Sequence, residues 1–464
     1  WNVVGSWGVS WEEELVERTQ DAADRSAEVS REEVNDRIHN RVEIHRRRAY
    51  PVINPLPIKN GLNPTRAQVP LDEGTPVKAY DFISRVISAQ RHRHPDDDET
   101  AVFQRFSDGL VVLDSGEPVS PDALIPPGRF LNFYRRPAPE REVPGTLDLL
   151  YEDNDLLVVD KPPFLATLPR GQHIAQTALT KARIQFGISE LSPCHRLDRL
   201  TRGVLMFTKR PEIRGAYQTM FDRREPKKIY EAITDIPQDP PSWLSEKIAG
   251  MGDTAATAET ISFEPPLPGG APGSSGSLSA AEKPCLEETP VAWQEGFYGE
   301  SPAPTEVPRD FTEIPSEVPW RLRPAPTANR PWILRHHMIK IRGRLCTYIS
   351  DGKPNAETAV TGVRAFIDTT STPRPTTRLA WRLEPHSGRT HQLRVVMRSL
   401  GMPIVNDSLY GFISTDALLR PDGELPKPLF VADEDFSRPM GLIARQLSFK
   451  DPLSNDHREF SSKL

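Results

Sequence analysis

A single carboxylate stands among cationic side chains near the middle of the chain. Residues 196–230 hold ten lysines and arginines against four acids, a net charge of +6. Such a local field suits phosphate groups, although a network of solvated salt bridges is the alternative. Phosphate binding alone gives no reason for Asp198 to stand there. The cationic and histidine side chains around it are His195, Arg196, Arg199 and Arg202.

A second basic stretch lies nearly 200 residues further along the chain. Residues 374–398 hold six arginines and one acid. The spacing predicts a helix that runs to about Leu400 and presents Arg394 and Arg398 one turn apart on one face. A phosphate-binding helix with no catalytic role is the alternative. The candidate N-cap residues are Ser387 and Thr390.

Other chemistry is weakly indicated by these stretches. Cys194 beside His195 suggests a thiol nucleophile, but adjacent side chains rarely face each other and no orienting acid is implied. A metal site built on His195, His386 and His391 is the other alternative. These histidines do not provide three ligands at a recognisable spacing. The three cysteines form no CxxC pair, so neither a disulfide framework nor a cysteine-rich zinc site is expected.

The acidic residues are concentrated elsewhere. The 464 residues carry a net charge of −6. Residues 12–37 have a net charge of −6, and residues 264–320 have a net charge of −8 and eleven of the 47 prolines. Without these two segments the remaining chain carries a net charge of +8, which makes a polyanionic partner plausible. The proline-rich segment predicts an extended insert.

Three motifs in order carry a resemblance to a known family. They resemble signature motifs of the RluA-like pseudouridine synthases, with a further likeness in Leu156–Pro162 upstream and Gly401–Gly411 downstream. The resemblance covers roughly 147–235 and 331–455. Arg202 stands where the family commonly has serine, Val396 where a histidine is frequent, and the insert is unusually long. The three motifs are His195–Gly203, Lys228–Ala232 and Gly388–Arg394.

The resemblance implies roles for individual residues. Asp198 would be the essential carboxylate, either attacking the nucleotide or removing a sugar proton. Tyr230 would lie against the flipped uracil, and Arg196 would fill the vacated stack. Arg394, or alternatively Arg389, would pair with Asp198, because a guanidinium offers a planar fork to a carboxylate. The residues expected to bind RNA are His195, Arg196, Arg199, Arg202, Lys228, Arg389, His391 and Arg398.

The expected fold is α+β, with a mixed, mainly antiparallel sheet split by an RNA-binding cleft. Residues 145–464 would form this catalytic domain, with the acidic insert at about 236–330. Residues 67–140 would form a small N-terminal domain, in which the strand and turns between Arg105 and Phe133 resemble a small RNA-binding domain. Residues 1–66 would be a charged tail and connector.

The expected reaction is the isomerisation of uridine in ribosomal or transfer RNA. It implies no metal, nucleotide or redox cofactor, since isomerisation needs no outside atoms or electrons. We expect a monomer with no obligate protein partner. No apolar run approaches bilayer length, so no membrane association is expected. The three cysteines without a CxxC pair fit a reducing cytoplasm. The rival hypothesis is a non-catalytic RNA-binding or ribosome-assembly factor that retains the fold.

Overall fold

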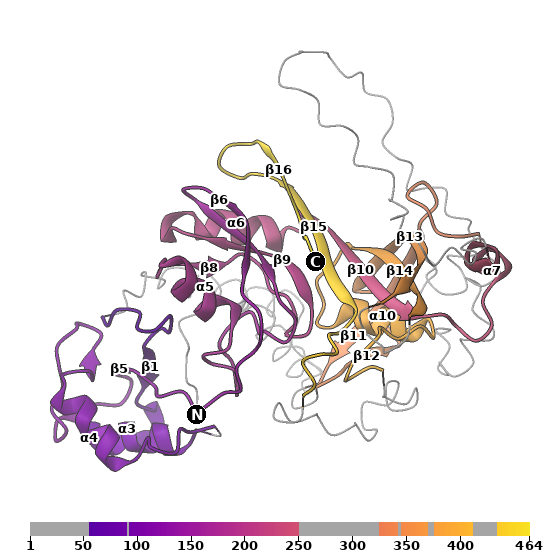
Figure 1. Ribbon diagram of the computed structural model, residues 1–464. Coiled ribbons are helices and arrows are strands. Elements are labelled where there is room, and N and C mark those ends of the chain that lie inside the picture. The colour runs from indigo at the N-terminus through magenta and orange to yellow at the C-terminus, as the bar shows by residue number, and fades with distance from the viewer. Residues whose placement is uncertain (1–54, 91, 250–323, 342–344, 370–374, 412–433) are drawn as a thin grey trace, which may run out of the picture. The chain divides into compact units, whose positions relative to one another are not determined.

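The computed structural model describes residues 55–90, 92–249, 324–341, 345–369, 375–411 and 434–464. Its chain contacts divide it into two units, one reaching to Glu140 and including Arg170–Ala175, the other built from Arg141–Pro169 and Gln176–Leu464 (Figure 1). The acidic stretch 12–37 and the core of the insert, 264–320, lie outside the described residues. The predictions made for them stay predictions.

The smaller unit combines two helices with short strands. A three-stranded sheet has the order β1–β5–β3, and β2 pairs with β4. Helix α3 begins after an extended Lys78, and the Asp98 side chain caps α4 by accepting from the Ala101 amide at 2.9 Å. The elements are β1 (Thr65–Gln68), β2 (Val77–Lys78), α3 (Ala79–Ser88), α4 (Glu99–Ser107), β3 (Val112–Leu113), β4 (Leu124–Ile125) and β5 (Phe130–Phe133).

Two details of this unit differ from the sequence expectation. The connector predicted to run to residue 66 ends earlier, because Thr65 already pairs with Phe133 in the sheet. The first strand of the segment between Arg105 and Phe133 is only two residues long, and the turn after it is closed by a bond from the Gly116 amide to the Leu113 carbonyl. The short pairings are supported by one buried apolar cluster, which includes side chains of α3, β1 and β5.

The larger unit is built on one eleven-stranded sheet. Its main path is β12–β11–β13–β14–β10–β15–β9–β7–β6, with β16 paired to β15 and β8 paired to β9. The strands are β6 (Asp148–Glu152), β7 (Leu156–Lys161), β8 (Ser192–Pro193), β9 (Arg202–Thr208), β10 (Lys227–Asp235), β11 (Trp332–Lys340), β12 (Thr347–Ser350), β13 (Ala356–Asp368), β14 (Thr376–Pro385), β15 (Leu442–Lys450) and β16 (His457–Ser461). The predicted α+β class with a mixed, mainly antiparallel sheet is confirmed.

Helices accompany this sheet on segments that the sequence marks well. Thr177 caps α5 by accepting from the Thr180 amide, and Gly187 ends it in the left-handed conformation. Helix α7 occupies part of the region expected to be an extended insert. The helices are α5 (Ala178–Phe186), α6 (Arg214–Asp222), α7 (Ser242–Ala249) and α10 (Gln392–Ser399).

The two halves of the sheet meet at a short parallel contact between β9 and β15. Only Ile443 with Arg202 and Ala444 with Gly203 are paired there. Gly203 has φ +116°, and a Cβ at that position would collide with the Ala444 backbone, so glycine is required for the approach. The loop that carries Asp198 therefore enters the sheet at the junction of the two halves, one strand away from β10.

Candidate active site

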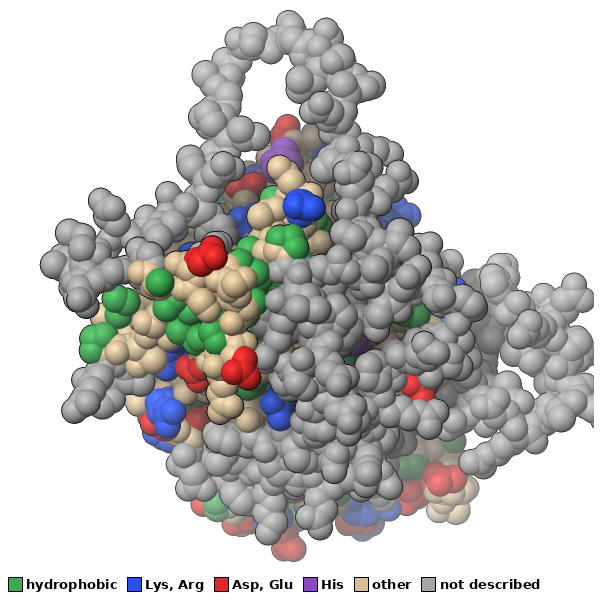
Figure 2. All heavy atoms as spheres, turned by 90° about the vertical axis from the view of Figure 1, so that its right-hand side faces the viewer, with side chains coloured by type: hydrophobic (Ala, Val, Ile, Leu, Met, Phe, Trp, Pro, Cys, Tyr) green, Lys and Arg blue, Asp and Glu red, His purple; other side chains and the backbone are tan. Residues whose placement is uncertain are grey.

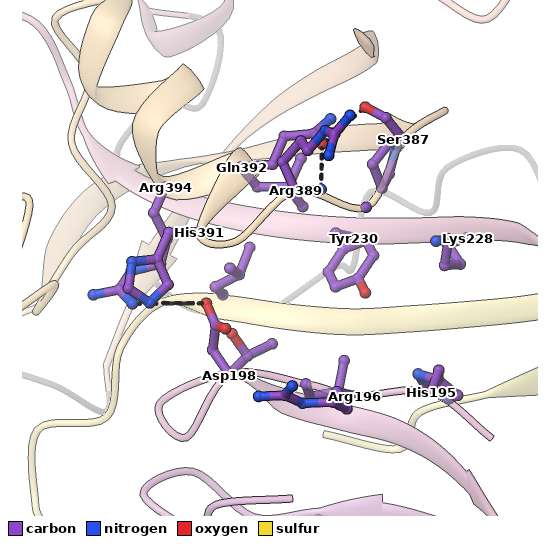
Figure 3. A pocket seen from close by; sticks show the side chains of 16 residues that line it. His195, Arg196, Asp198, Lys228, Tyr230, Ser387, Arg389, His391, Gln392 and Arg394 are labelled. Carbon is purple, nitrogen blue, oxygen red and sulfur yellow. Dashed lines mark hydrogen bonds and ion pairs between the residues drawn. The ribbon is translucent and has the colours of Figure 1, made fainter. Parts of the chain in front are cut away.

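A cleft in the larger unit brings together side chains from three segments that lie far apart in the sequence. They come from the loop before β9, from β10, and from the turn that leads into α10 (Figure 3). All three residues predicted to be catalytic line it: Asp198, Tyr230 and Arg394. Five of those predicted to bind RNA line it as well, namely His195, Arg196, Lys228, Arg389 and His391.

The loop that carries Asp198 is held by bonds to its backbone. The Thr167 hydroxyl donates to the Leu197 carbonyl at 2.7 Å and accepts from the Leu197 amide at 3.1 Å. The buried Lys161 ammonium donates to the carbonyls of Leu165 at 2.8 Å and Arg199 at 3.3 Å. Both flanks of Asp198 are thus fixed while its side chain stays one-third exposed in the cleft.

The Asp198 carboxylate faces two side chains of the opposite segment at moderate distance. Arg394 Nη1 lies 3.7 Å from Asp198 Oδ2, and His391 Nε2 lies 3.9 Å from the same oxygen. Figure 3 shows both side chains on the same side of the carboxylate. At these distances the carboxylate gains attraction from the guanidinium without being closed off by a short bond, which leaves it room to react.

The planar fork of Arg394 is directed at a different acid from the one expected. Arg394 Nε and Nη2 donate to the two oxygens of Asp407 at 2.8 and 2.7 Å. Both side chains are almost fully buried, and the Asp407 carboxylate also accepts from the backbone amides of Leu409 and Tyr410. The expectation that the fork holds Asp198 is therefore wrong. Asp407 fixes the guanidinium, and only its remaining Nη1 is turned to Asp198.

Tyr230 projects from β10 at an irregular point of the sheet. The register between β10 and β15 shifts between Ile229 and Tyr230. Burial, reinforced by the charge of Asp198, raises the pKa of Tyr230 above its usual range. The phenol is consequently neutral at any working pH, and it presents a flat aromatic face and a hydroxyl to the cleft.

The N-terminus of α10 differs from the prediction. His391 is the N-cap residue, with φ +56° and no side-chain cap bond, so neither Ser387 nor Thr390 caps the helix. Instead the Gln392 side chain accepts from the Ser387 hydroxyl at 2.9 Å and from the Arg389 amide at 3.1 Å. The glutamine thereby ties the turn together from inside the helix, which the spacing of capping residues does not reveal.

His195 supplies a ring rather than a charge. It stacks on Phe221 with the ring centroids 4.9 Å apart, and its Nε2 accepts from the Met206 amide at 3.3 Å. Burial, with a contribution from the cation of Lys228, lowers the pKa of His195 to about 3. The imidazole is therefore neutral. Its neighbour Cys194 is buried, which raises the pKa of its thiol and disfavours the thiolate that a nucleophile needs.

Three residues expected to bind RNA lie outside the lining of this cleft. The Arg199 guanidinium forms a bidentate pair with Glu434 at 2.6 and 2.7 Å. Arg202 is paired across the strands with Ile443, which is itself paired with Glu231. Its side chain therefore lies on the face of the sheet opposite to Tyr230. The third, Arg398, follows one turn after Arg394 on α10.

Four further residues support the site without having been assigned a role from the sequence. Lys161 and Thr167 hold the Asp198 loop, Asp407 holds Arg394, and the Tyr410 hydroxyl lies 3.0 Å from His391 Nδ1. The flanking motifs contain Lys161, Asp407 and Tyr410, so the sequence offered a signal that these three belong to the site. Thr167 lies outside every motif. Within the described ranges, no group of three or more histidine, cysteine or acidic residues is arranged to hold a metal ion.

Comparison with known proteins extends the resemblance. Residues 155–270 match the family model described as RNA pseudouridylate synthase. An uncharacterised RNA pseudouridine synthase of Synechocystis is 32% identical over 153 residues, covering 32% of this chain and 52% of the relative. The dual-specificity RNA pseudouridine synthase RluA of Haemophilus influenzae is 39% identical over 88 residues, covering 19% of this chain and 39% of the relative.

Another relative and one solved structure have similar names. The tRNA pseudouridine(31) synthase of Saccharomyces cerevisiae is 34% identical over 94 residues, covering 20% of this chain and 23% of the relative. The human RNA pseudouridylate synthase domain containing 1 aligns over 69% of this chain and 91% of its own, with 18% identity and a TM-score of 0.35. This structural likeness is too low to add to the argument.

The match to the family model and the named relatives agree with the resemblance found in the motifs: residues 155–270 are similar to RluA-like RNA pseudouridine synthases. The chain spans about half the length, or less, of these curated relatives. Among the helices that the structure describes, none has the length and apolar character needed to cross a bilayer.

Proposed function

We propose that the protein is an RNA pseudouridine synthase that isomerises uridine in ribosomal or transfer RNA. The observation that carries the proposal is the convergence of Asp198, Tyr230 and Arg394 in one cleft, although they are separated by up to 196 positions in the chain. A cleft for RNA phosphates alone needs no carboxylate. The names of the relatives support the same reaction class.

In the proposed reaction the bond from ribose C1′ to uracil N1 breaks, the base turns, and C1′ bonds to C5. The proton at C5 is lost and N1 gains one, so atoms balance and no electrons are exchanged with another molecule. Asp198 either attacks the nucleotide or removes a sugar proton, and both routes need it ionised. The guanidinium of Arg394 lies 3.7 Å from this carboxylate and attracts its negative charge.

The remaining cleft residues suit a flipped nucleotide. The target base must leave its stack, at a cost of a few kcal/mol. In this proposal the exposed Arg196 occupies the vacated position and the neutral Tyr230 lies against the uracil, since both residues line the cleft. Lys228 and Arg389 line the same cleft and can contact the flanking phosphates. In the face seen in Figure 2, the described part carries scattered charged side chains of both signs among apolar and polar ones.

The test is tritium release from RNA labelled at uridine C5, with RNA binding measured in parallel. We expect release by the wild-type protein and none by Asp198→Asn, while the affinity for RNA stays within about tenfold because phosphate contacts supply most of the binding. Turnover by Asp198→Asn would end the assignment of the carboxylate.

The same assay separates the rival function. A wild-type protein that binds RNA tightly but releases no tritium from ribosomal or transfer RNA would be a binding factor and not a synthase. If tritium is released, mapping pseudouridines in cells with and without the protein identifies the substrate. A uridine that loses its modification in the deletion strain and regains it with the wild-type gene, but not with Asp198→Asn, is the target.

A further inference from the structure

The phenol of Tyr410 is buried directly behind the cleft. Its hydroxyl accepts from the Thr347 amide at 2.7 Å and lies 3.0 Å from His391 Nδ1 and 3.4 Å from the Thr347 carbonyl. Its ring meets the imidazole edge to face, with the centroids 5.6 Å apart, and also packs against the Arg394 guanidinium. Tyr410 therefore touches both side chains that face Asp198.

The single hydroxyl proton can go to only one of two acceptors. The Thr347 carbonyl at 3.4 Å is at the long limit of an O–H···O bond, whereas His391 Nδ1 at 3.0 Å is the closer acceptor. If the Tyr410 hydroxyl donates a hydrogen bond to His391 Nδ1, that nitrogen is the acceptor and carries no hydrogen of its own. The hydrogen of a neutral imidazole must then be on Nε2.

The other ring nitrogen agrees with this allocation. His391 Nε2 points toward Asp198 and lies 3.9 Å from Oδ2. An N–H at Nε2 places its positive end toward the carboxylate, whereas a bare nitrogen would place a lone pair there. Burial, opposed by the charge of Asp198, lowers the pKa of His391 to about 4, so the imidazole is neutral near pH 7.

The backbone holds the ring in this position at a cost. His391 has φ +56°, a left-handed conformation that non-glycine residues adopt rarely, and its carbonyl accepts the first helical bond of α10 from the Val395 amide. The strained turn aims the imidazole between Tyr410 and Asp198. A ring held only for packing has no need of this placement.

Resting on the proposed function, we propose that Tyr410 is a positioning residue that fixes His391 in the tautomer with hydrogen on Nε2, so that His391 presents a neutral hydrogen-bond donor to the Asp198 carboxylate or to the nucleotide joined to it. Arg394 supplies charge to the Asp198 carboxylate, and His391, on the same side of that carboxylate, supplies a directed N–H. A neutral donor stabilises the developing charge without competing for the RNA phosphates.

The tautomer can be observed without any enzyme assay. The 464-residue chain labelled with ¹⁵N at its 11 histidines gives ring-nitrogen signals that distinguish protonated from bare nitrogens. The signals of His391 are assigned by their loss in His391→Gln. We expect Nε2 protonated and Nδ1 bare in the wild type at pH 7, and a mixture of tautomers in Tyr410→Phe. A proton on Nδ1 in the wild type, or an unchanged tautomer in Tyr410→Phe, overturns the inference.

Two substitutions of the histidine test what the donor does. The amide of glutamine can place an N–H near the position of Nε2, whereas the shorter amide of asparagine reaches only the position of Nδ1. Asparagine is the better residue for a left-handed backbone, so strain alone favours His391→Asn. We expect the opposite order in single-turnover rate at saturating enzyme, with His391→Gln at least tenfold faster than His391→Asn and RNA affinity similar in both.

Equal rates for these two folded variants would show that the Nε2 donor is not used. Circular dichroism and thermal unfolding of each variant establish that it is folded. If the wild-type protein itself proves inactive on RNA, the proposed function fails, and the nitrogen spectra still decide whether Tyr410 fixes the tautomer.

Discussion

The two segments that face each other across the cleft are stabilised in different ways. The loop around Asp198 is held through its backbone, by Thr167 and Lys161, and the reacting side chain has its charged neighbours at 3.7 and 3.9 Å. The segment opposite it is held through its side chains. Arg394 forms two bonds of 2.8 and 2.7 Å to Asp407, in surroundings that are almost closed to solvent.

The two sides of the cleft thus differ in which of their groups are fixed by short bonds and which are left free of them. In the proposed reaction the Asp198 carboxylate attacks or removes a proton, so it cannot be saturated by short bonds, and its position is defined by the backbone on either side. The groups that stabilise charge do not move during reaction and can be fixed in advance, which is what makes electrostatic stabilisation effective. Each side of the cleft can therefore be disturbed separately.

Disturbing the segment around Arg394, which is held through its side chains, should have the largest effect on stability. Asp407→Asn keeps the size of the residue but leaves the Arg394 guanidinium buried without an opposite charge at bonding distance, which we expect to lower the free energy of unfolding by about 3–5 kcal/mol. Chemical denaturation measures it. Glu225→Gln, which removes an exposed pair with Arg223 at 3.9 Å, is the control and should change stability by about 0.5 kcal/mol or less.

The loss should also appear in catalysis, because a released guanidinium no longer faces Asp198 in one orientation. At temperatures where Asp407→Asn remains folded, we expect its single-turnover rate to fall much more than its affinity for RNA. An Asp407→Asn protein as stable and as fast as the wild type would show that the buried pair is not what holds Arg394.

Disturbing the backbone-held loop should have a smaller effect that depends on pH. Burial lowers the pKa of Lys161 to about 7 from 10.5, opposed by the charge of Asp198. Between these two values the folded protein binds fewer protons at Lys161 than the unfolded chain, so the free energy of unfolding increases with pH across this window and is lowest below it. The slope is at most about 1.4 kcal/mol per pH unit.

Lys161→Met removes the titrating group while filling a similar volume, so the difference in stability between wild type and variant isolates this dependence. We expect that difference to shift in favour of the wild type as the pH rises from 7 to 9.5, in denaturation curves measured at several pH values. A difference that does not change over this range would mean that Lys161 keeps the same charge in the folded and unfolded chain.

Sequence patterns predicted the segments of the site well because the reacting groups lie in dense local motifs. Asp198, Tyr230 and Arg394 could be identified from three stretches of chain, and all three line one cleft. The α+β class also followed, since short apolar strands alternate with helical periods. These are properties of neighbouring residues, which a sequence displays directly.

The partners of these groups could not be predicted, because pairing depends on the fold. Arg394 was expected to fork onto Asp198, yet Asp407 lies 13 positions away and satisfies both donors. Thr167 stands 30 positions before the loop it holds, in no recognisable motif. The N-cap of α10 was misassigned for a similar reason, since a strained His391 replaces the usual capping side chain.

Local charge likewise could not tell which arginines line the cleft, and substitutions at two of them should have the smallest effect. Arg202 and Arg389 both stand in basic stretches. Arg389 lines the cleft, whereas the side chain of Arg202 lies on the opposite face of the sheet, near the charges of Arg445 and Glu231.

Each phosphate contact that is lost reduces the salt slope of binding by about one unit. We therefore expect Arg389→Ala to weaken RNA binding and flatten its salt dependence by about that amount, and Arg202→Ser to leave both nearly unchanged. Titration of labelled RNA at several salt concentrations measures the two quantities, and circular dichroism checks that both variants are folded. If Arg202→Ser flattens the slope as much as Arg389→Ala, the bound RNA must extend around the sheet to the face opposite Tyr230, and the cleft is only part of the binding surface.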